Sequence, residues 1–279
     1  MAIGPSPVRE GVSRLAAETP TLPPATHTNS YALGTREVIL VEPATPYEAE
    51  RAAWIAWARE LEASGRKIVA IFATHHHPDH VGGATFFASE LGVPIWAHEK
   101  TAQRLATVKI DRHLADGETL VLDGPSQQRW DVMHTPGHAP GHLCLFERAS
   151  GVVVVGDMVA SVGTILIEPT EGDMIEYLAQ LSRLEKLDAK VALPAHGDPI
   201  EEPSRLFRAY RAHRLMREER VVMAMGDEGG TLDELVPRAY AVVGPELYPI
   251  ARLSLEAHLV KLERDGRVQR LGDRFVAAS

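Results

Sequence analysis

The spacing of apolar residues divides most of the chain into alternating short strands and helices. Short apolar runs predict buried strands, and an apolar repeat near 3.6 residues predicts helices. Strands are expected at 31–34, 38–41, 67–73, 93–97 and 190–193, and helices at 47–64, 81–91 and 173–187. Residues 113–155 have the pattern of further strands, separated by Asp-Gly and Ser-Gly turn signals. This mixture predicts a layered α/β architecture up to about residue 200.

The two ends of the chain differ from this middle part. Five prolines in residues 1–25 predict an extended N-terminal arm with little regular structure, because proline restricts itself and the preceding residue. Helices expected at 204–225, 231–240 and 250–265, followed by a hairpin turning at Gly272-Asp273, predict a winged-helix-like module. We therefore expect an arm over 1–25, an α/β domain over 26–203 and a C-terminal module over 204–279.

Composition and charge narrow the possible functions. The chain has 279 residues and a formal charge of −9, which argues against general nucleic-acid binding through phosphate contacts. The acidic excess lies in residues 1–204, with 16 Lys or Arg against 27 Asp or Glu, whereas residues 205–279 have 13 against 11. A single cysteine, Cys144, excludes an intramolecular disulfide and a cysteine-rich zinc module.

The N-terminal segment gives no sign of export. Its first residues, MAIGPSPVRE, lack the apolar core of a secretion signal. No run in the chain approaches the roughly 18 apolar residues that a membrane span requires. We expect a cytoplasmic protein without a membrane segment.

Four of the 13 histidines lie in one short motif directly after the expected strand 67–73. The segment reads Thr74-His-His-His-Pro-Asp-His80. In an extended segment His75 and His77 point to the same side and His76 points away. Asp79 and His80 follow at the turn into the next helix. Two imidazoles and a separate carboxylate–imidazole pair can serve two adjacent metal ions, whereas the alternative is a histidine-rich surface loop.

Three further candidates follow apolar runs in the same way. They are His138 in a Thr-Pro-Gly-His segment, Asp157 in a Gly-Asp pair and His196 in a Pro-Ala-His-Gly segment. Small residues beside each of them allow the backbone to pass close to a metal centre. Each residue alone has an ordinary loop explanation, so the joint occurrence carries the prediction of one site.

Together these motifs resemble those of the metallo-β-lactamase-fold hydrolases, over residues 26–200. Other segments are similar to the lactamase-beta-like-2 group, which includes a single-strand endoribonuclease and fungal polyketide thioesterases. These segments are TNSYALG at 28–34, VGDMVASVGT at 155–164, YRAHR at 210–214 with Arg217-Glu218, and HLVKLE at 258–263. The resemblance implies a four-layer αββα sandwich followed by the winged-helix-like module.

The resemblance also implies a binuclear centre with two Zn²⁺ ions, with Fe or Mn as alternatives. One ion would be bound by His75, His77 and His138, the other by Asp79, His80 and His196, with Asp157 bridging. A hydroxide held between the ions would attack the substrate, and Asp79 would orient it or accept its proton, so Asp79 and Asp157 are the expected catalytic residues.

Two nearby residues qualify this assignment. His142 is the alternative to His138 as a ligand, or else it supports the site without binding metal. Glu42 stands where many family members have Asp, which puts one supporting contact in doubt.

The substrate stays open between an acyl compound (a thioester or lactone) and a phosphodiester, with single-strand endoribonuclease as the specific alternative activity. A non-catalytic binding protein that uses the C-terminal module is a further alternative. Partners are therefore a small ester-type molecule or single-stranded nucleic acid, no membrane, and an oligomeric state for which a dimer is compatible.

Six arginines recur at every third position from Arg205 to Arg220. Because a three-residue step turns a helix by about −60°, they cannot form one stripe, and some of them must pair with acids or pack.

Overall fold

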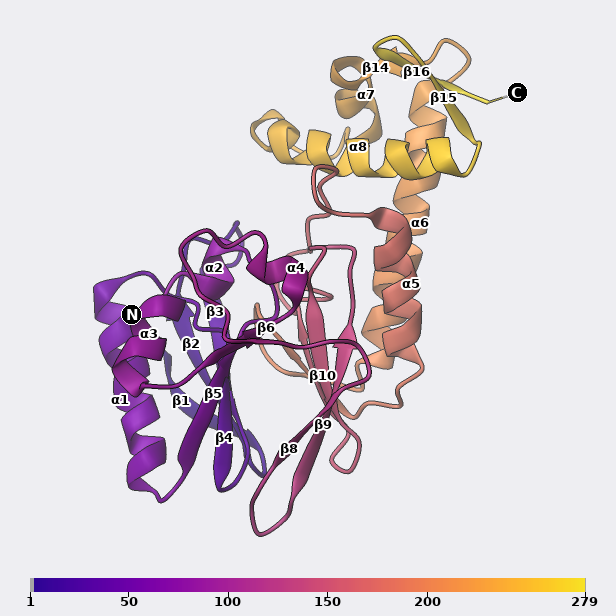
Figure 1. The fold of residues 1–279 in the computed structure, drawn as a ribbon. Coiled ribbons are helices and arrows are strands. Elements are labelled where there is room, and N and C mark those ends of the chain that lie inside the picture. Colours follow the sequence, from indigo (N-terminus) through magenta and orange to yellow (C-terminus); the bar gives the residue numbers. More distant parts are fainter. Residues whose placement is uncertain (1–2, 279) are drawn as a thin grey trace. The chain divides into compact units, whose positions relative to one another are not determined.

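The computed structural model describes residues 3–278. The chain forms two compact units, and their elements are labelled in Figure 1. Unit 1 comprises Met1–Thr135, Pro140–Ile165 and Asp188–Pro203. Unit 2 comprises Pro136–Ala139, Leu166–Leu187 and Ser204–Ser279.

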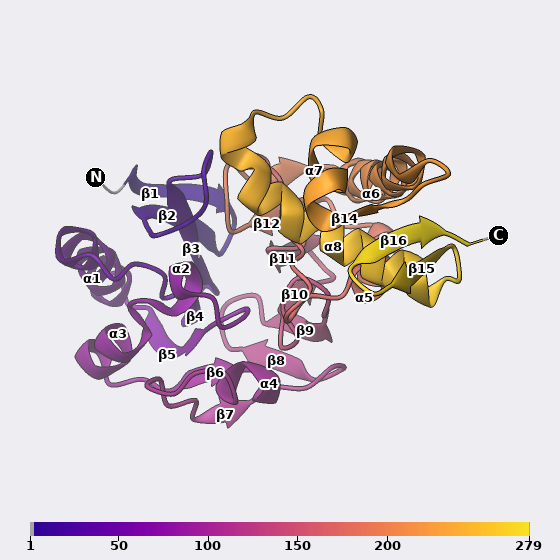
Figure 2. The ribbon, with the colours of Figure 1, turned by 90° about the horizontal axis from the view of Figure 1, so that it is seen from above.

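Unit 1 contains a seven-stranded sheet in which the strand order follows the sequence. Its strands are β1 (Ile3–Arg9), β2 (Val12–Glu18), β3 (His27–Leu33), β4 (Glu37–Val41), β5 (Lys67–Phe72), β6 (Ile95–Ala97) and β7 (Arg112–His113). Pairing is antiparallel from β1 to β4 and parallel from β4 to β7. Helices α1 (Glu48–Ala63) and α3 (Ala84–Leu91) lie on one face of this sheet (Figures 1 and 2). There Trp54 of α1 stacks on Phe87 of α3 with 3.9 Å between ring centroids.

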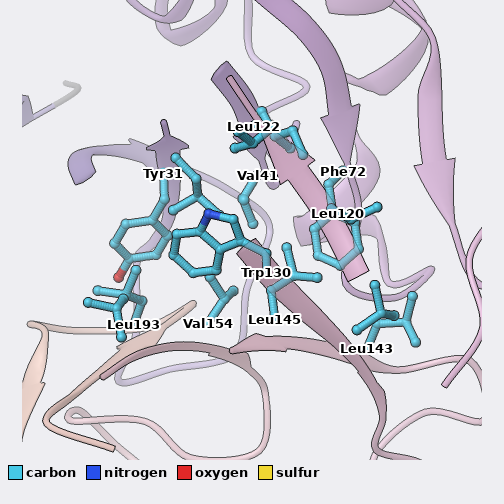
Figure 3. Packing of buried hydrophobic residues seen from close by; sticks show 14 of the residues in the cluster. Tyr31, Val41, Phe72, Leu120, Leu122, Trp130, Leu143, Leu145, Val154 and Leu193 are labelled. Carbon is cyan, nitrogen blue, oxygen red and sulfur yellow. The ribbon is translucent and has the colours of Figure 1, made fainter. Parts of the chain in front are cut away.

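A second sheet of six strands packs on the other face, in the order β13-β12-β11-β10-β9-β8. Its strands are β8 (Thr119–Leu122), β9 (Gln128–His134), β10 (Leu143–Glu147), β11 (Val152–Gly156), β12 (Val191–Pro194) and β13 (Ile200–Glu201). Figure 3 shows Trp130 of β9 between residues of both sheets, including Tyr31 of β3 and Val154 of β11. Cys144 of β10 is also fully buried, in agreement with a core role. The predicted layered α/β architecture is confirmed.

The expectation of little regular structure in residues 1–25 is wrong for the segment that forms β1 and β2. Pro5 and Pro7 are tolerated because β1 is an edge strand, which among the described residues pairs with β2 alone. Pro5 also lies in an irregularity of the register, between Ile3 and Ser6, and Pro7 borders a second one.

The single helix expected over 81–91 is divided into α2 (Pro78–Val81) and α3. Two glycines separate them because the chain is crowded there. A Cβ on Gly82 would lie 2.7 Å from the Pro78 carbonyl oxygen, and one on Gly83 would lie 2.6 Å from the Thr45 carbonyl oxygen. The break therefore ends α2 after a single turn. A further short helix, α4 (Glu99–Ala102), follows β6.

Unit 2 contains four helices and a small three-stranded sheet among its described residues. The helices are α5 (Met174–Glu185), α6 (Ser204–Met225), α7 (Leu232–Ala239) and α8 (Tyr248–Arg264), and a 3₁₀ turn covers Pro245–Leu247. The strands are β14 (Gly230–Thr231), β15 (Val268–Leu271) and β16 (Arg274–Ala277). The expected order of three helices followed by a hairpin is confirmed, and Val221, Leu235, Leu255 and Phe275 are among the residues that form its core.

The arginines of α6 pair and pack as the helical geometry predicts. Arg208 donates a 2.9 Å hydrogen bond to Glu185, and Arg211 donates one of 3.0 Å to Ser182. Arg214 is buried over the ring of Tyr177, and Arg217 is buried over Tyr240, where it also donates to the Ala239 carbonyl. Two of the six arginines are therefore buried within unit 2 and two more bond to α5, whereas Arg205 and Arg220 are exposed.

Within residues 3–278, no helix has both the length and the apolar character that crossing a lipid bilayer demands.

Candidate metal centre

The histidine motif begins two residues after β5 and leads into α2. His75 is buried, and its Nε2 lies 2.9 Å from Nδ1 of His77. His77 precedes the first turn of α2, and Pro78 occupies the first helical position, which suits its fixed φ. Asp79 and His80 therefore project from this one turn. The rings of His75 and His80 lie 4.0 Å apart between centroids, so both parts of the motif share one site.

Four of the predicted ligands converge within unit 1. Nε2 of His196 lies 3.5 Å from an oxygen of Asp79 and 3.5 Å from an oxygen of Asp157. Nε2 of His80 lies 3.8 Å and 3.6 Å from oxygens of the same two carboxylates. These separations are close to the ligand–ligand distance of about 3.4 Å around a tetrahedral Zn²⁺ with bonds near 2.1 Å. In addition, the buried Nε2 of His80 makes no hydrogen bond within residues 3–278. The donor set and its spacing thus fit a metal ion.

The loop that carries His196 is fixed by β3. Nδ1 of His196 donates to the His27 carbonyl oxygen over 3.0 Å, which leaves Nε2 on the side of the two carboxylates. The Asn29 amide group donates to the carbonyl oxygens of Pro194 and Gly197, over 2.9 and 2.7 Å. Asn29 belongs to the TNSYALG motif, for which the sequence suggested no role.

Glu42 supports His80 from the other side. One oxygen of its carboxylate lies 3.1 Å from Nδ1 of His80 and accepts a 2.5 Å hydrogen bond from Thr74. The backbone of Glu42 has φ 57°, and the Ser30 hydroxyl donates to its carbonyl oxygen over 2.5 Å. A carboxylate behind a metal-binding imidazole orients the ring and raises its basicity. The contact placed in doubt by glutamate at position 42 is present as an ion-pair distance, without hydrogen-bond geometry at Nδ1.

The electrostatics of this cluster favour a bound cation. Burial opposes charge on His80, but Asp79, Glu42 and Asp157 outweigh it and raise its pKa well above the ordinary value. Burial also opposes charge on Asp157, but His196 and His80 hold its pKa well below the usual range. The pKa of His196 is raised, again against burial, chiefly by Asp157. In the absence of metal, Asp157 therefore stays ionised, and the rings of His80 and His196 hold protons.

His138 lies in unit 2, within the short segment Pro136–Ala139. Its Nδ1 lies 2.8 Å from the Leu166 carbonyl oxygen, which fixes the ring and directs the proton to that nitrogen. Gly137 has φ 133°, and a Cβ there would lie 2.4 Å from the backbone of Tyr177. Glycine is thus required beside His138, as the motif suggested.

His142 is fully buried and uses both ring nitrogens. Nδ1 lies 2.8 Å from the Thr135 hydroxyl, and Nε2 accepts a 3.1 Å hydrogen bond from the Asp157 backbone N–H. A ring engaged on both sides does not serve as a metal ligand, so the structure does not support His142 as the alternative to His138.

A known family model covers the whole segment that contains these residues. The model of the metallo-beta-lactamase superfamily matches residues 23–196, more than half of the chain. The chain belongs to the metallo-beta-lactamase superfamily. The model of the beta-lactamase associated winged helix domain matches residues 231–276. The predicted metallo-beta-lactamase fold, the winged-helix module and hydrolase activity are confirmed for this superfamily member.

Individual relatives agree with this assignment of the chain to the superfamily. It is 27% identical to the beta-lactamase-like protein 2 homolog of Drosophila melanogaster, over 75% of this chain and 73% of that protein. It is 28% identical to the atrochrysone carboxyl ACP thioesterase of Aspergillus chevalieri, over 86% of this chain and 77% of that protein. A crystal structure of a metallo-beta-lactamase family protein from Thermus thermophilus superposes with a TM-score of 0.79 at 26% identity, covering 96% of this chain and 99% of the other.

Proposed function

We propose that the protein is a binuclear zinc hydrolase that cleaves acyl thioesters. The observation that carries the hydrolytic centre is the convergence of four side chains. Nε2 of His80 and Nε2 of His196 each lie 3.5–3.8 Å from oxygens of both Asp79 and Asp157. One ion is assigned to Asp79, His80 and His196, with Asp157 bridging to a second ion on His75, His77 and His138. The second set rests on the resemblance of the motifs.

Each residue of the first set has a distinct task. Two bound ions would supply an activated water and polarise the carbonyl of the substrate. Asp79 has a more exposed side chain than Asp157, at 15% against 10%, so it is the carboxylate better placed to hold the proton released by water. Asp157 keeps its charge between two imidazoles and is the better bridge. His80 and His196 are oriented from behind by Glu42 and the His27 carbonyl oxygen.

A thioester is favoured over a phosphodiester for three reasons. A relative at 28% identity is named a thioesterase. Moreover, the arginines of α6, which were the main sequence feature in favour of RNA, include two that are buried and two that bond to residues of α5. Residues 1–204 carry an acidic excess, which repels a polyanion.

Purified protein is expected to hydrolyse an acyl-coenzyme A thioester faster than single-stranded RNA, and to contain two equivalents of zinc. The test compares a thioester, a lactone and single-stranded RNA under one buffer condition, with elemental analysis of the same preparation. The Asp79→Asn variant identifies activity that comes from contaminants. Cleavage of RNA but not of thioester, lost in Asp79→Asn, would assign the endoribonuclease activity instead, and the absence of transition metal would refute the centre.

The affinity for zinc is expected to rise with pH across the neutral range. In the metal-free protein the pKa values of His80 and His196 are raised, so both rings keep a proton above the ordinary histidine range. Zinc must displace these protons, because only neutral imidazole binds metal. Lower pH therefore weakens binding, and the gain in affinity ends above the raised pKa values. Calorimetry in buffers of different ionisation enthalpy measures the protons released, and binding without proton release would contradict this cluster.

A further inference from the structure

His142 lies where three segments of the proposed centre meet. Thr135, which bonds to its Nδ1, directly follows β9 on the way to His138, and Asp157, which bonds to its Nε2, follows β11. The next residue, Leu143, donates its backbone N–H to the Thr74 carbonyl oxygen over 2.9 Å. The His142 ring also lies 5.2 Å from the His75 ring. We propose that His142, held as the neutral Nδ1–H tautomer, is a positioning residue that fixes the Asp157 turn and thereby the carboxylate between His80 and His196.

The hydrogen bonds define the tautomer. A backbone N–H can only donate, so Nε2 of His142 is the acceptor and carries no proton. The ring proton is then on Nδ1 and is donated to Thr135 Oγ1 over 2.8 Å. The Thr135 hydroxyl can donate a hydrogen bond to Cys144 Sγ, 3.3 Å away, or to the His142 carbonyl oxygen. All of these groups are buried, where losing one partner leaves the other unsatisfied.

The turn before Asp157 is shaped to bring its N–H onto the ring. Gly156 has φ 46°, and a Cβ at this position would lie 2.6 Å from Nε2 of His142. No other residue type allows the same approach. The glycine of the Gly-Asp motif and the second histidine of the His-Ala-Pro-Gly-His segment thus form a matched pair. The hydrogen bond from the Asp157 N–H to Nε2 of His142 joins the two motifs without a metal ion.

Substitution of His142 by glutamine or by asparagine tests the two hydrogen bonds of the ring separately. In His142→Gln the side-chain oxygen can replace Nε2 as the acceptor for the Asp157 N–H. In His142→Asn the amide nitrogen can replace Nδ1 as the donor to Thr135, but the side chain is too short to reach Asp157. Gln is therefore expected to retain the Asp157 turn and Asn to release it, although both remove the imidazole.

Three measurements test the proposal. In the metal-free wild type, ¹⁵N NMR is expected to show a protonated Nδ1 and an unprotonated Nε2 for His142. Hydrogen exchange of the Asp157 amide should remain slow in His142→Gln and become at least about 10-fold faster in His142→Asn. Titration with Co²⁺, followed by its absorption spectrum, should show affinity about 10- to 100-fold weaker in His142→Asn and within a few-fold of wild type in His142→Gln. His213→Asn, the same change at an exposed position, should alter none of these.

The outcomes distinguish a failure of this inference from a failure of the proposed function. Only the expected effect on metal affinity rests on the proposed function. A protonated Nε2 in the wild type, or equal exchange of the Asp157 amide in the Gln and Asn variants, would overturn the inference even if the protein hydrolyses thioesters. The expected tautomer and exchange pattern in a protein without thioesterase activity would leave the inference standing and refute the substrate assignment. The wild-type NMR result needs no variant, so a misfolded variant does not prevent the test.

Discussion

The Asp79→Asn variant is expected to lose thioester hydrolysis by about 1,000-fold or more in kcat/KM, since general acid–base groups and metal ligands contribute on this scale. One oxygen of Asp79 lies within 3.8 Å of Nε2 of both His80 and His196. The amide has the same shape but lacks the charge that holds a metal ion and accepts a proton. The fold should therefore persist while the chemistry is lost.

The matched control is Asp198→Asn, which makes the same change on a side chain that is 87% exposed and pairs with Arg14. An exposed pair of this kind contributes little, so its activity and stability should equal those of the wild type. Steady-state kinetics and near-ultraviolet circular dichroism on the three proteins check the result. If Asp79→Asn kept more than a tenth of the activity, Asp79 could not have the role assigned to it.

Removal of the metal is expected to abolish hydrolysis and to lower the free energy of unfolding. A ligand present at 100 times its dissociation constant stabilises the folded state by about 2.7 kcal/mol per site, so two sites give about 5 kcal/mol. The loss follows from this linkage, because the ions bind the folded arrangement of Asp79, His80, Asp157 and His196 and not the unfolded chain. Denaturant unfolding before and after dialysis against a chelator measures the difference.

Adding zinc back should restore both activity and stability in the wild type. In the Asp157→Ala variant the same cycle should change stability much less, because the bridging carboxylate is gone. An unfolding midpoint that chelation leaves unchanged in the wild type would show that the cluster is not a metal centre under those conditions.

The sequence predicted most elements because their local patterns are strong. The long helix from Ser204 to Met225 and the hairpin at Gly272 were both expected at these positions. Two local expectations failed for steric reasons that a pattern does not contain. The prolines of β1 are compatible with an edge strand, and the break before α3 arises from contacts of Gly82 and Gly83 with the backbones of Pro78 and Thr45.

The candidate ligands were also accessible from the sequence, but the groups that orient them were not. Asn29 acts on residues 194 and 197, which are more than 160 positions away along the chain. Glu42 lies 3.1 Å from His80 and has a backbone with positive φ, which a sequence pattern does not reveal. Such contacts depend on how β3, β4 and β12 are brought together, so a single sequence gives the motif without the role. The bonding of His142 on both sides is a similar case, since its spacing alone also fitted a ligand.

The composition of the two units has a consequence for how the chain is made. Helix α5 lies in the middle of the sequence, yet it belongs to unit 2 and bonds through Ser182 and Glu185 to α6. During synthesis, unit 1 therefore cannot be completed before residue 203 has been added. Helix α5 cannot pack against α6 until residues 204–225 have been synthesised. A fragment that stops at residue 203 would leave the α6-facing side of α5 uncovered. The two units are compact, but their sequence segments alternate along the chain, so neither unit is synthesised as one continuous stretch.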